Sequence, residues 1–198
     1  MTTRRPGDHH DWHSAEYVSS WITQDVTRDD ERSVLVRRML ELAPFATDAG
    51  ISVLDVGGGY GVISEQVLDM FPQARVTLQD YSEPMLAQAR KRLDSFGDRV
   101  SFVQRDFTEP DWTAGLGGPF DLAVSGIAIH NLGASGPIPH VYAGVCGVLK
   151  PGGAFLNLDY AEFSGGIEAH LRWLKEAGFD RAEEAWKEHR QSAMASFK

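Results

Sequence analysis

The residues of this chain best suited to chemistry lie in one short stretch, VLDVGGGYG at residues 53–61. Asp55 stands among β-favouring apolar residues, and Gly57, Gly59 and Gly61 follow at alternate positions. Glycine has no Cβ and tolerates positive φ, so such a turn lets a ligand contact bare backbone. A helix after the turn would point free N–H groups into the same space. The stretch predicts a nucleotide-type cradle after a buried strand, or else a strand-to-helix turn without a ligand.

The spacing of the glycines bears on which nucleotide would bind. A dinucleotide-binding turn follows the pattern G-x-G-x-x-G, with its third glycine three positions after the second. Here the pattern is D-x-G-x-G-x-G, and Val62 occupies the position of that third glycine. A nicotinamide-dependent oxidoreductase, the alternative class of enzyme on a similar sheet, is therefore disfavoured.

Two further acids stand where later strands are expected to end. Asp80 lies 25 positions after Asp55, where an acid can accept both hydroxyl protons of a ribose. The alternative is that Asp80 caps the next helix, a role for which Ser82 is better placed. Asp106 could accept a hydrogen bond from the exocyclic amine of adenine, while the Phe107 N–H donates to a ring nitrogen. For Asp106 an exposed turn acid remains the alternative.

His130 is the candidate general base. It follows the fourth expected strand, and the pKa of histidine lies in the range that suits proton transfer near neutral pH. A base is needed only if the nucleophile arrives protonated. The alternative is a histidine that merely caps or lines the segment after this strand.

The elements that must position these residues alternate between strand and helix. Pro72 stops one helix, and Lys150–Gly153 is expected to be a helix stop followed by a turn. The alternation predicts an α/β fold with a doubly wound, mostly parallel sheet. The expected strands are residues 51–56, 75–79, 100–104, 120–125, 154–159, 181–186 and 191–197, and the expected helices are 61–71, 82–96, 137–149 and 167–177, after a helical segment over 12–44.

Composition narrows the class of partner and the compartment. The chain has 19 Lys and Arg against 28 Asp and Glu, a formal net charge of −9, and no long basic run, so a nucleic-acid partner is not expected. Its apolar stretches fall far short of the ~20 residues that cross a membrane, and the N-terminus lacks the apolar core of a signal peptide. The single cysteine, Cys146, excludes an internal disulfide and suits a cytoplasmic location.

Five motifs follow one another at the expected strand ends: VLDVGGGYG (53–61), TLQDYSEPML (77–86), QRDF (104–107), FDLAVSG (120–126) and LKPGG (149–153). Together they resemble the motifs of the class I S-adenosylmethionine-dependent methyltransferases. The resemblance covers roughly residues 50–160. It implies a seven-stranded Rossmann-like sheet, S-adenosylmethionine as cofactor, S-adenosylhomocysteine as product, and no metal.

The resemblance also implies a division of the chain. Residues 1–11 are expected to be disordered, and residues 12–198 to form a single methyltransferase domain. Within it, residues 12–48 would be N-terminal helices, residues 50–160 the cofactor-binding core, and residues 161–198 a C-terminal helix with closing strands.

Specific cofactor contacts follow from the same resemblance, all at the ends of strands. Gly57 and Gly59 would contact the methionine part of the cofactor, and Asp55 would shape its pocket. Asp80 would bind the ribose, and Tyr81, Asp106 and Phe107 would contact the adenine. Ser125 would face the reacting end, largely through its backbone. Aromatic residues of the N-terminal helices, Trp12, Tyr17 and Trp21, are candidates for a lid, with plain core packing as the alternative.

The implied function is methyl transfer to a small-molecule acceptor by in-line displacement, for which orientation can supply roughly 7–11 kcal/mol. No N-P-P-Y type of motif follows the fourth strand, which counts against methylation of nucleobase amino groups and of the glutamine amide. Between Asp159 and Gly165 the chain is short, so the acceptor side would be open, completed by the N-terminal helices, or closed by a second subunit of a homodimer. The alternatives are a protein acceptor and a non-catalytic regulatory protein that binds S-adenosylmethionine.

Overall fold

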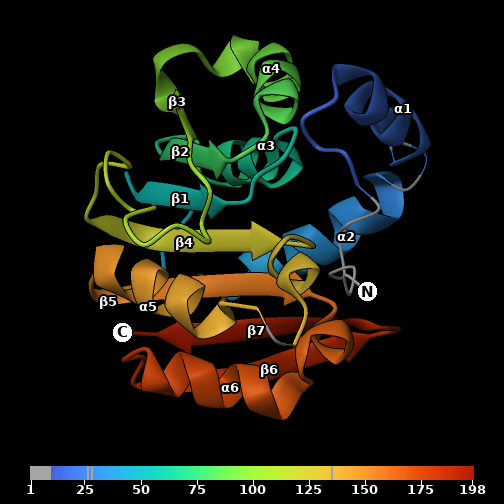
Figure 1. The fold of residues 1–198 in the computed structure, drawn as a ribbon. Helices are drawn as coiled ribbons and strands as arrows, with labels where there is room; N and C mark the ends of the chain where they lie inside the picture. The colour runs from blue at the N-terminus through green and yellow to red at the C-terminus, as the bar shows by residue number, and fades with distance from the viewer. Residues whose placement is uncertain (1–9, 26, 28, 135) are drawn as a thin grey trace, which may run out of the picture.

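The computed structural model describes residues 10–198 apart from 26, 28 and 135. Its centre is one seven-stranded sheet, as predicted, and the strand order is β3-β2-β1-β4-β5-β7-β6 (Figure 1). Strands β1 to β5 run parallel, and β7 runs antiparallel to both of its neighbours. The strands are β1 (Ser52–Val56), β2 (Arg75–Asp80), β3 (Val100–Gln104), β4 (Phe120–Gly126), β5 (Leu149–Asp159), β6 (Arg181–Glu188) and β7 (Gln191–Phe197).

Helices cover both faces of the sheet and explain why its central strands are almost wholly apolar. Successive residues of a strand point to opposite faces, so Val53 packs with the helices α2, α3 and α4, whereas Leu54 packs with α5 and α6. Both side chains are fully buried. The helices are α1 (Ala15–Asp25), α2 (Asp29–Leu40), α3 (Val62–Met70), α4 (Glu83–Arg92), α5 (Ile138–Val148) and α6 (Ile167–Glu176), with short 3₁₀ turns η2 (Asp94–Arg99), η3 (Ile129–Leu132) and η4 (Ala161–Ser164).

Two helices end earlier than the sequence predicts. Helix α2 stops at Leu40 and not at Pro44, because the N–H groups of Leu42 and Ala43 donate to carbonyls three residues back, so tight turns replace the helix before the proline. Helix α4 stops at Arg92 and not near Phe96, and the 3₁₀ turn that follows contains Gly97 at φ 58°.

The prediction of a turn at Lys150–Gly153 is wrong, because these residues belong to β5. The Gly152 N–H donates to the carbonyl of Lys198 at 2.7 Å, and the Lys198 N–H donates to Gly153 at 2.9 Å. These bonds to the end of the chain extend the strand, and the register shifts before Ala154. A β-bulge of this kind absorbs residues that local sequence marks as a turn.

Disorder was predicted for residues 1–11, and of these residues 1–9 lie outside the described part of the chain. Cys146 is buried on α5. None of the helices in the described part of the chain is long and apolar enough to cross a membrane.

Candidate functional site

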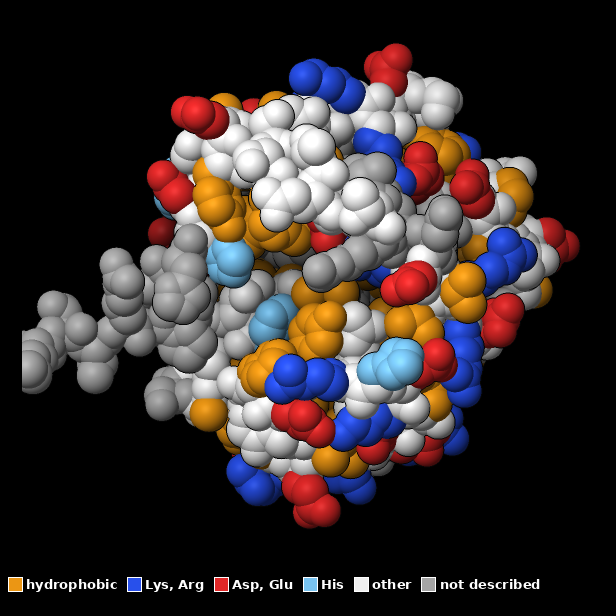
Figure 2. Space-filling model, turned by 90° about the vertical axis from the view of Figure 1, so that its right-hand side faces the viewer, with side chains coloured by type: hydrophobic (Ala, Val, Ile, Leu, Met, Phe, Trp, Pro, Cys, Tyr) orange, Lys and Arg blue, Asp and Glu red, His pale blue; other side chains and the backbone are white. Residues whose placement is uncertain are grey.

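A cleft of about 1370 Å³ opens at the edge of the sheet where the parallel strands end. Figure 2 looks onto this side of the molecule, where hydrophobic and histidine side chains gather around a hollow. Loops after β1, β2, β3 and β4 line the cleft, together with residues before and within α1 and α2. The cleft therefore lies where the sequence predicts a nucleotide site.

The glycine turn after β1 is shaped as an open cradle. Gly57 and Gly59 have φ values of 64° and 54°, in the left-handed region. A Cβ on Gly57 would lie 2.8 Å from the Ala128 side chain, whereas a Cβ on Gly59 would meet no atom within 4 Å. The turn is thus packed on one side and open on the other, as a bound ligand against the backbone requires.

Two side chains from the end of β2 hold this turn in place. The Gly59 N–H donates to Asp80 Oδ2 at 2.9 Å, and the Gly57 N–H donates to Gln79 Oε1 at 3.0 Å. Gln79 also donates to the carbonyl of Arg105 at 2.6 Å and so ties the turn to the end of β3. The sequence did not predict this role of Gln79; the signal was a polar residue inside a buried strand.

Asp80 lies in the cleft wall and is 7 % exposed. Its Oδ1 accepts a 2.8 Å hydrogen bond from the Ser82 N–H. Each carboxylate oxygen has two lone pairs, so both keep acceptor capacity toward the cleft. Burial raises the pKa of Asp80. Ser82, not Asp80, is the N-cap of α4, because its Oγ accepts from the Met85 N–H at 3.2 Å, as predicted.

The three residues predicted to contact adenine all line the same cleft: Tyr81, Asp106 and Phe107. Asp106 accepts from the backbone N–H and the hydroxyl of Thr108 at 2.8 and 2.7 Å, which fixes its carboxylate. The ring of His13 contacts Tyr81 edge-on with centroids 5.3 Å apart. Strands β2 and β3 thereby bring the predicted adenine contacts beside the predicted ribose contact.

Asp55 and Ser125 lie behind the cleft wall, with fully buried side chains that are not among its lining residues. Asp55 accepts a 2.6 Å hydrogen bond from Ser64 on α3, and burial raises its pKa to about 7. The Ser125 hydroxyl donates to the carbonyl of Val56 at 2.8 Å. Asp55 therefore braces the turn from below, since its carboxyl group would lie 2.9 Å from a Cβ on Gly58. At the end of β4, Gly126 lines the cleft in place of the predicted Ser125.

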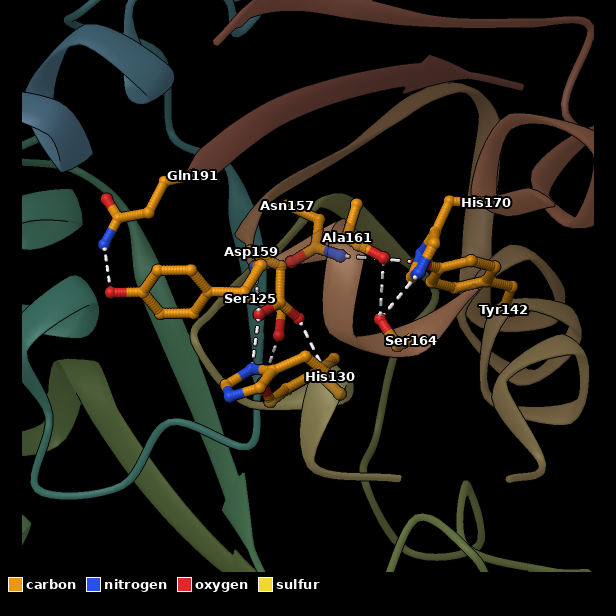
Figure 3. A network of polar contacts seen from close by, with 11 residues as sticks. Ser125, His130, Tyr142, Asn157, Asp159, Ala161, Ser164, His170 and Gln191 are labelled. Carbon is orange, nitrogen blue, oxygen red and sulfur yellow. Dashed lines mark hydrogen bonds and ion pairs between the residues drawn. The ribbon is translucent and has the colours of Figure 1, made fainter. Parts of the chain in front are cut away.

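His130 lines the cleft from η3 and forms a pair with Asp159 at the end of β5 (Figure 3). The ring Nδ1 lies 2.6 Å from Asp159 Oδ1, and the His130 backbone N–H donates to Asp159 Oδ2 at 3.0 Å. The Tyr160 N–H also donates to Oδ1, at 2.9 Å. Because a carboxylate only accepts, the neutral imidazole carries its proton on Nδ1, and Nε2 is left as an acceptor.

Asp159 was not predicted as a site residue. Its side chain is fully buried, whereas that of His130 is 16 % exposed. The available signal was that an acid again closes a parallel strand, as at the ends of the second and third strands. Pairing with His130 depends on β4 lying beside β5, which local sequence does not reveal.

Of the three aromatic residues predicted as a lid, Trp12 and Trp21 line the cleft, whereas Tyr17 does not. Both tryptophans line the cleft, and their rings meet edge-on at 5.2 Å. The carbonyl of Trp12 accepts from the Ser82 hydroxyl, and Trp21 packs edge-on against Tyr60 of the glycine turn at 6.1 Å. The first helix is therefore anchored to the cradle.

The cleft has an acidic lining. The described lining residues include Asp11, Asp25, Asp80 and Asp106, and among the described part of the lining Arg32 is the one lysine or arginine. Arg32 donates to both oxygens of Asp25, through Nη2 at 2.6 Å to Oδ1. The described residues contain no cluster of three or more His, Cys, Asp or Glu that could hold a metal ion.

Comparisons with known proteins give the family. A family model described as a methyltransferase domain matches residues 53–153, just over half of the chain. The release factor glutamine methyltransferase of Chlorobaculum tepidum is 38 % identical over 104 residues, which cover 50 % of this chain and 35 % of that protein. The ubiquinone/menaquinone biosynthesis C-methyltransferase UbiE of Paracoccus denitrificans is 33 % identical over 127 residues, 63 % of this chain and 47 % of that protein. The chain thus spans about a third to a half of these curated relatives.

Solved structures share the fold along the whole chain. An O-methyltransferase family protein from Burkholderia thailandensis superposes with a TM-score of 0.77 at 18 % identity, over 98 % of this chain and 63 % of that one. PigF with SAH gives a TM-score of 0.76 at 16 % identity, over 100 % of this chain and 63 % of that one. The matched residues contain all five sequence motifs. The chain belongs to the class I S-adenosylmethionine-dependent methyltransferase family.

Proposed function

We propose that this protein transfers a methyl group from S-adenosylmethionine to a small molecule whose nucleophilic atom carries a proton, with His130 as general base. The observation that carries the proposal is that the His130–Asp159 pair and the open glycine cradle share one cleft. When bound, S-adenosylmethionine supplies an electrophilic methyl group on a sulfonium. The protein must bind and orient the two reactants, accept the proton and exclude water.

The cleft fits this cofactor on the cradle side. The open space at Gly59 and the φ of Gly57 suit the methionine part against backbone. Asp80 offers two acceptor oxygens to the ribose hydroxyls. The acidic lining favours a ligand with a positive centre. The proposed contacts to the adenine are Tyr81, Asp106 and Phe107, with Asp55 bracing the turn.

The base side of the cleft handles the proton. Nε2 of His130 would accept the proton of the acceptor group, and the charge that forms on the imidazole is stabilised by Asp159. Asp159 also fixes the tautomer, as the buried acid of a catalytic triad does. General base catalysis of this kind contributes typically about 10²–10⁴-fold to the rate. Trp12 and Trp21 help to exclude water from the cleft.

The relatives do not fix the acceptor, because they include methyltransferases named for a release factor glutamine, for small-subunit ribosomal RNA and for quinone biosynthesis. The acidic cleft disfavours the phosphates of RNA. A protein acceptor and a binding protein without catalysis remain the competing candidates, and the acceptor panel described at the end of the Discussion separates them.

The cofactor is tested by thermal unfolding with S-adenosylmethionine, S-adenosylhomocysteine and NAD, each near a hundredfold excess over a plausible dissociation constant. Binding at that excess stabilises the fold by ~2.7 kcal/mol. For a domain of this size this amounts to a rise in Tm of roughly 5–10 °C. We expect the rise with the two adenosyl compounds and none with NAD. No rise with either adenosyl compound would contradict the proposal.

A further inference from the structure

Beyond the base, the cleft ends in a group of three aromatic rings. The ring centroids of His130 and Tyr160 are 5.3 Å apart, those of Tyr160 and Phe163 5.7 Å, and those of His130 and Phe163 6.4 Å. These separations lie in the range in which rings attract one another. His130 and Tyr160 line the cleft, and Phe163 extends the group to the surface.

Core packing does not account for this group. Phe163 is 46 % exposed, and of the described residues only it and Val34 are large hydrophobics that are exposed. The guanidinium of Arg190 lies 4.4 Å from the Phe163 ring centroid and covers part of it. A partly exposed aromatic side chain beside a candidate base that lines a cleft is where a ligand would gain contact area.

The segment that carries these rings is held in place from several sides. The Tyr160 hydroxyl accepts a 2.9 Å hydrogen bond from Gln191 on β7. The hydroxyl of Ser164 in η4 lies 2.9 Å from Nε2 of the buried His170 on α6. The segment is therefore ordered before a ligand arrives, so binding does not have to order it.

The charges around the cleft select against one class of acceptor. The described lining has four aspartates, and its arginine, Arg32, is already paired with Asp25. A phosphorylated or carboxylated acceptor would meet net repulsion inside the cleft, because Arg190, the cation over Phe163, is not among the cleft-lining residues. The free acceptor lone pair of His130 Nε2 instead calls for a ligand that donates a hydrogen bond.

We propose that the acceptor is an uncharged, planar aromatic compound with a hydroxyl group. Its ring packs against Tyr160, next to Phe163, and its hydroxyl donates to Nε2 of His130. This inference rests on the proposed function, since it takes His130 to be the base, but it makes claims about ring shape and charge that the proposed function does not.

The test is a calorimetric binding experiment on the whole chain saturated with S-adenosylhomocysteine. Three probes of one skeleton are compared: 1-naphthol, the saturated decahydro-1-naphthol, and 1-naphthyl phosphate. We expect 1-naphthol to bind most tightly and the phosphate most weakly. Tyr160→Leu should weaken 1-naphthol binding roughly 2- to 12-fold, the worth of one aromatic contact, and should leave decahydro-1-naphthol almost unchanged.

Two further variants serve as controls. Tyr160→Phe keeps the ring and should keep most of the affinity for 1-naphthol. Phe96→Leu removes a partly buried ring outside the cleft and should change no affinity. Circular dichroism and S-adenosylhomocysteine affinity show that each variant is folded.

The outcomes separate the two proposals. If the phosphate binds as well as 1-naphthol, or if Tyr160→Leu binds both alcohols as the wild type does, the aromatic acceptor is wrong while the cofactor assignment stands. If S-adenosylhomocysteine itself does not bind the wild type, the proposed function fails and the inference that rests on it fails too.

Discussion

Replacing Asp80 by alanine should remove most of the affinity for S-adenosylhomocysteine. The carboxylate is 7 % exposed, is held by the N–H groups of Gly59 and Ser82, and lines the cleft. A hydrogen bond to a charged group contributes about 1.5–3 kcal/mol, so two ribose hydroxyls account for about 3–6 kcal/mol. Since each 1.4 kcal/mol is tenfold, Asp80→Ala should weaken binding about 10²- to 10⁴-fold.

The same change has a cost in stability that must be measured separately. Without the carboxylate, the two N–H groups lose their acceptor, at about 1–3 kcal/mol for a buried donor. For the two donors together this is about 2–6 kcal/mol, so at roughly 2–4 °C per kcal/mol the Tm of the unliganded variant should fall by about 4–24 °C. Affinities are therefore compared by isothermal titration calorimetry at a temperature at which both proteins are folded.

A matched control is Asp98→Ala. Asp98 is likewise an aspartate with a bound partner, Arg75 at 3.1 Å, but its side chain is 86 % exposed and lies outside the cleft. It should bind S-adenosylhomocysteine as the wild type does. If folded Asp80→Ala binds within about threefold of the wild type, the assignment of Asp80 to the ribose is refuted.

Three other changes test the base, the cradle and the buried acid. Asp159→Asn replaces one of the two acceptor oxygens that face His130 by an NH₂ donor, which either disfavours the Nδ1–H tautomer or opposes the backbone N–H. We expect kcat to fall about 10²- to 10⁴-fold while the affinity for S-adenosylhomocysteine is kept. An unchanged kcat would exclude a role of the His130–Asp159 pair in catalysis. Gly59→Ala places a methyl group in the open cradle on a residue with φ 54°, so it should lower the stability by about 1–2 kcal/mol and also weaken cofactor binding. Thermal unfolding measures the first effect and calorimetry the second. An unchanged affinity would mean that the cofactor lies elsewhere. Burial raises the pKa of Asp55 to about 7, so the folded state binds its proton more tightly than the unfolded state does, and the stability that this contributes is lost as the pH rises from about 4 through 7. Asp55→Asn should therefore show a smaller fall in unfolding free energy as the pH rises over that interval in urea titrations, and an identical profile would show that Asp55 does not titrate there.

The strands were predictable because their sequence signals are local. Val100–Gln104 was expected with the boundaries that it has, and the glycine turn after residues 51–56 was located by its own residue types. Residues 181–186 were expected to form a strand although their Ala and Glu content is poor for strands, and in the structure β6 alternates exposed and half-buried residues.

The misplaced boundaries depend on contacts distant in sequence. Residues 150–153 read as a turn, yet they join β5 because Lys198 bonds to Gly152 and Gly153. A chain segment 45 or more residues away cannot be read from the Pro-Gly-Gly signal itself. Long-range pairing overrode the local preference there.

The candidate site divides in the same way. The cofactor side was predicted from motifs, and the structure brings Gly57, Gly59 and Asp80 into one wall. Gln79 and Asp159 were missed because their roles consist of bonds to other strands and loops, 22 and 29 positions apart in sequence. A side chain that acts by holding another one leaves little trace in the sequence.

The most direct test of the central claim is a transfer experiment with S-adenosylmethionine that carries a deuterated methyl group. The whole chain and His130→Asn are incubated with a panel of uncharged aromatic hydroxyl compounds, amines, thiols and one basic peptide, and the products are identified by mass spectrometry. The account predicts a labelled methyl group on a hydroxyl compound, formed about 10²-fold or more slowly by the variant. Transfer at an equal rate by His130→Asn, or bound cofactor with no labelled product from any acceptor, would contradict it.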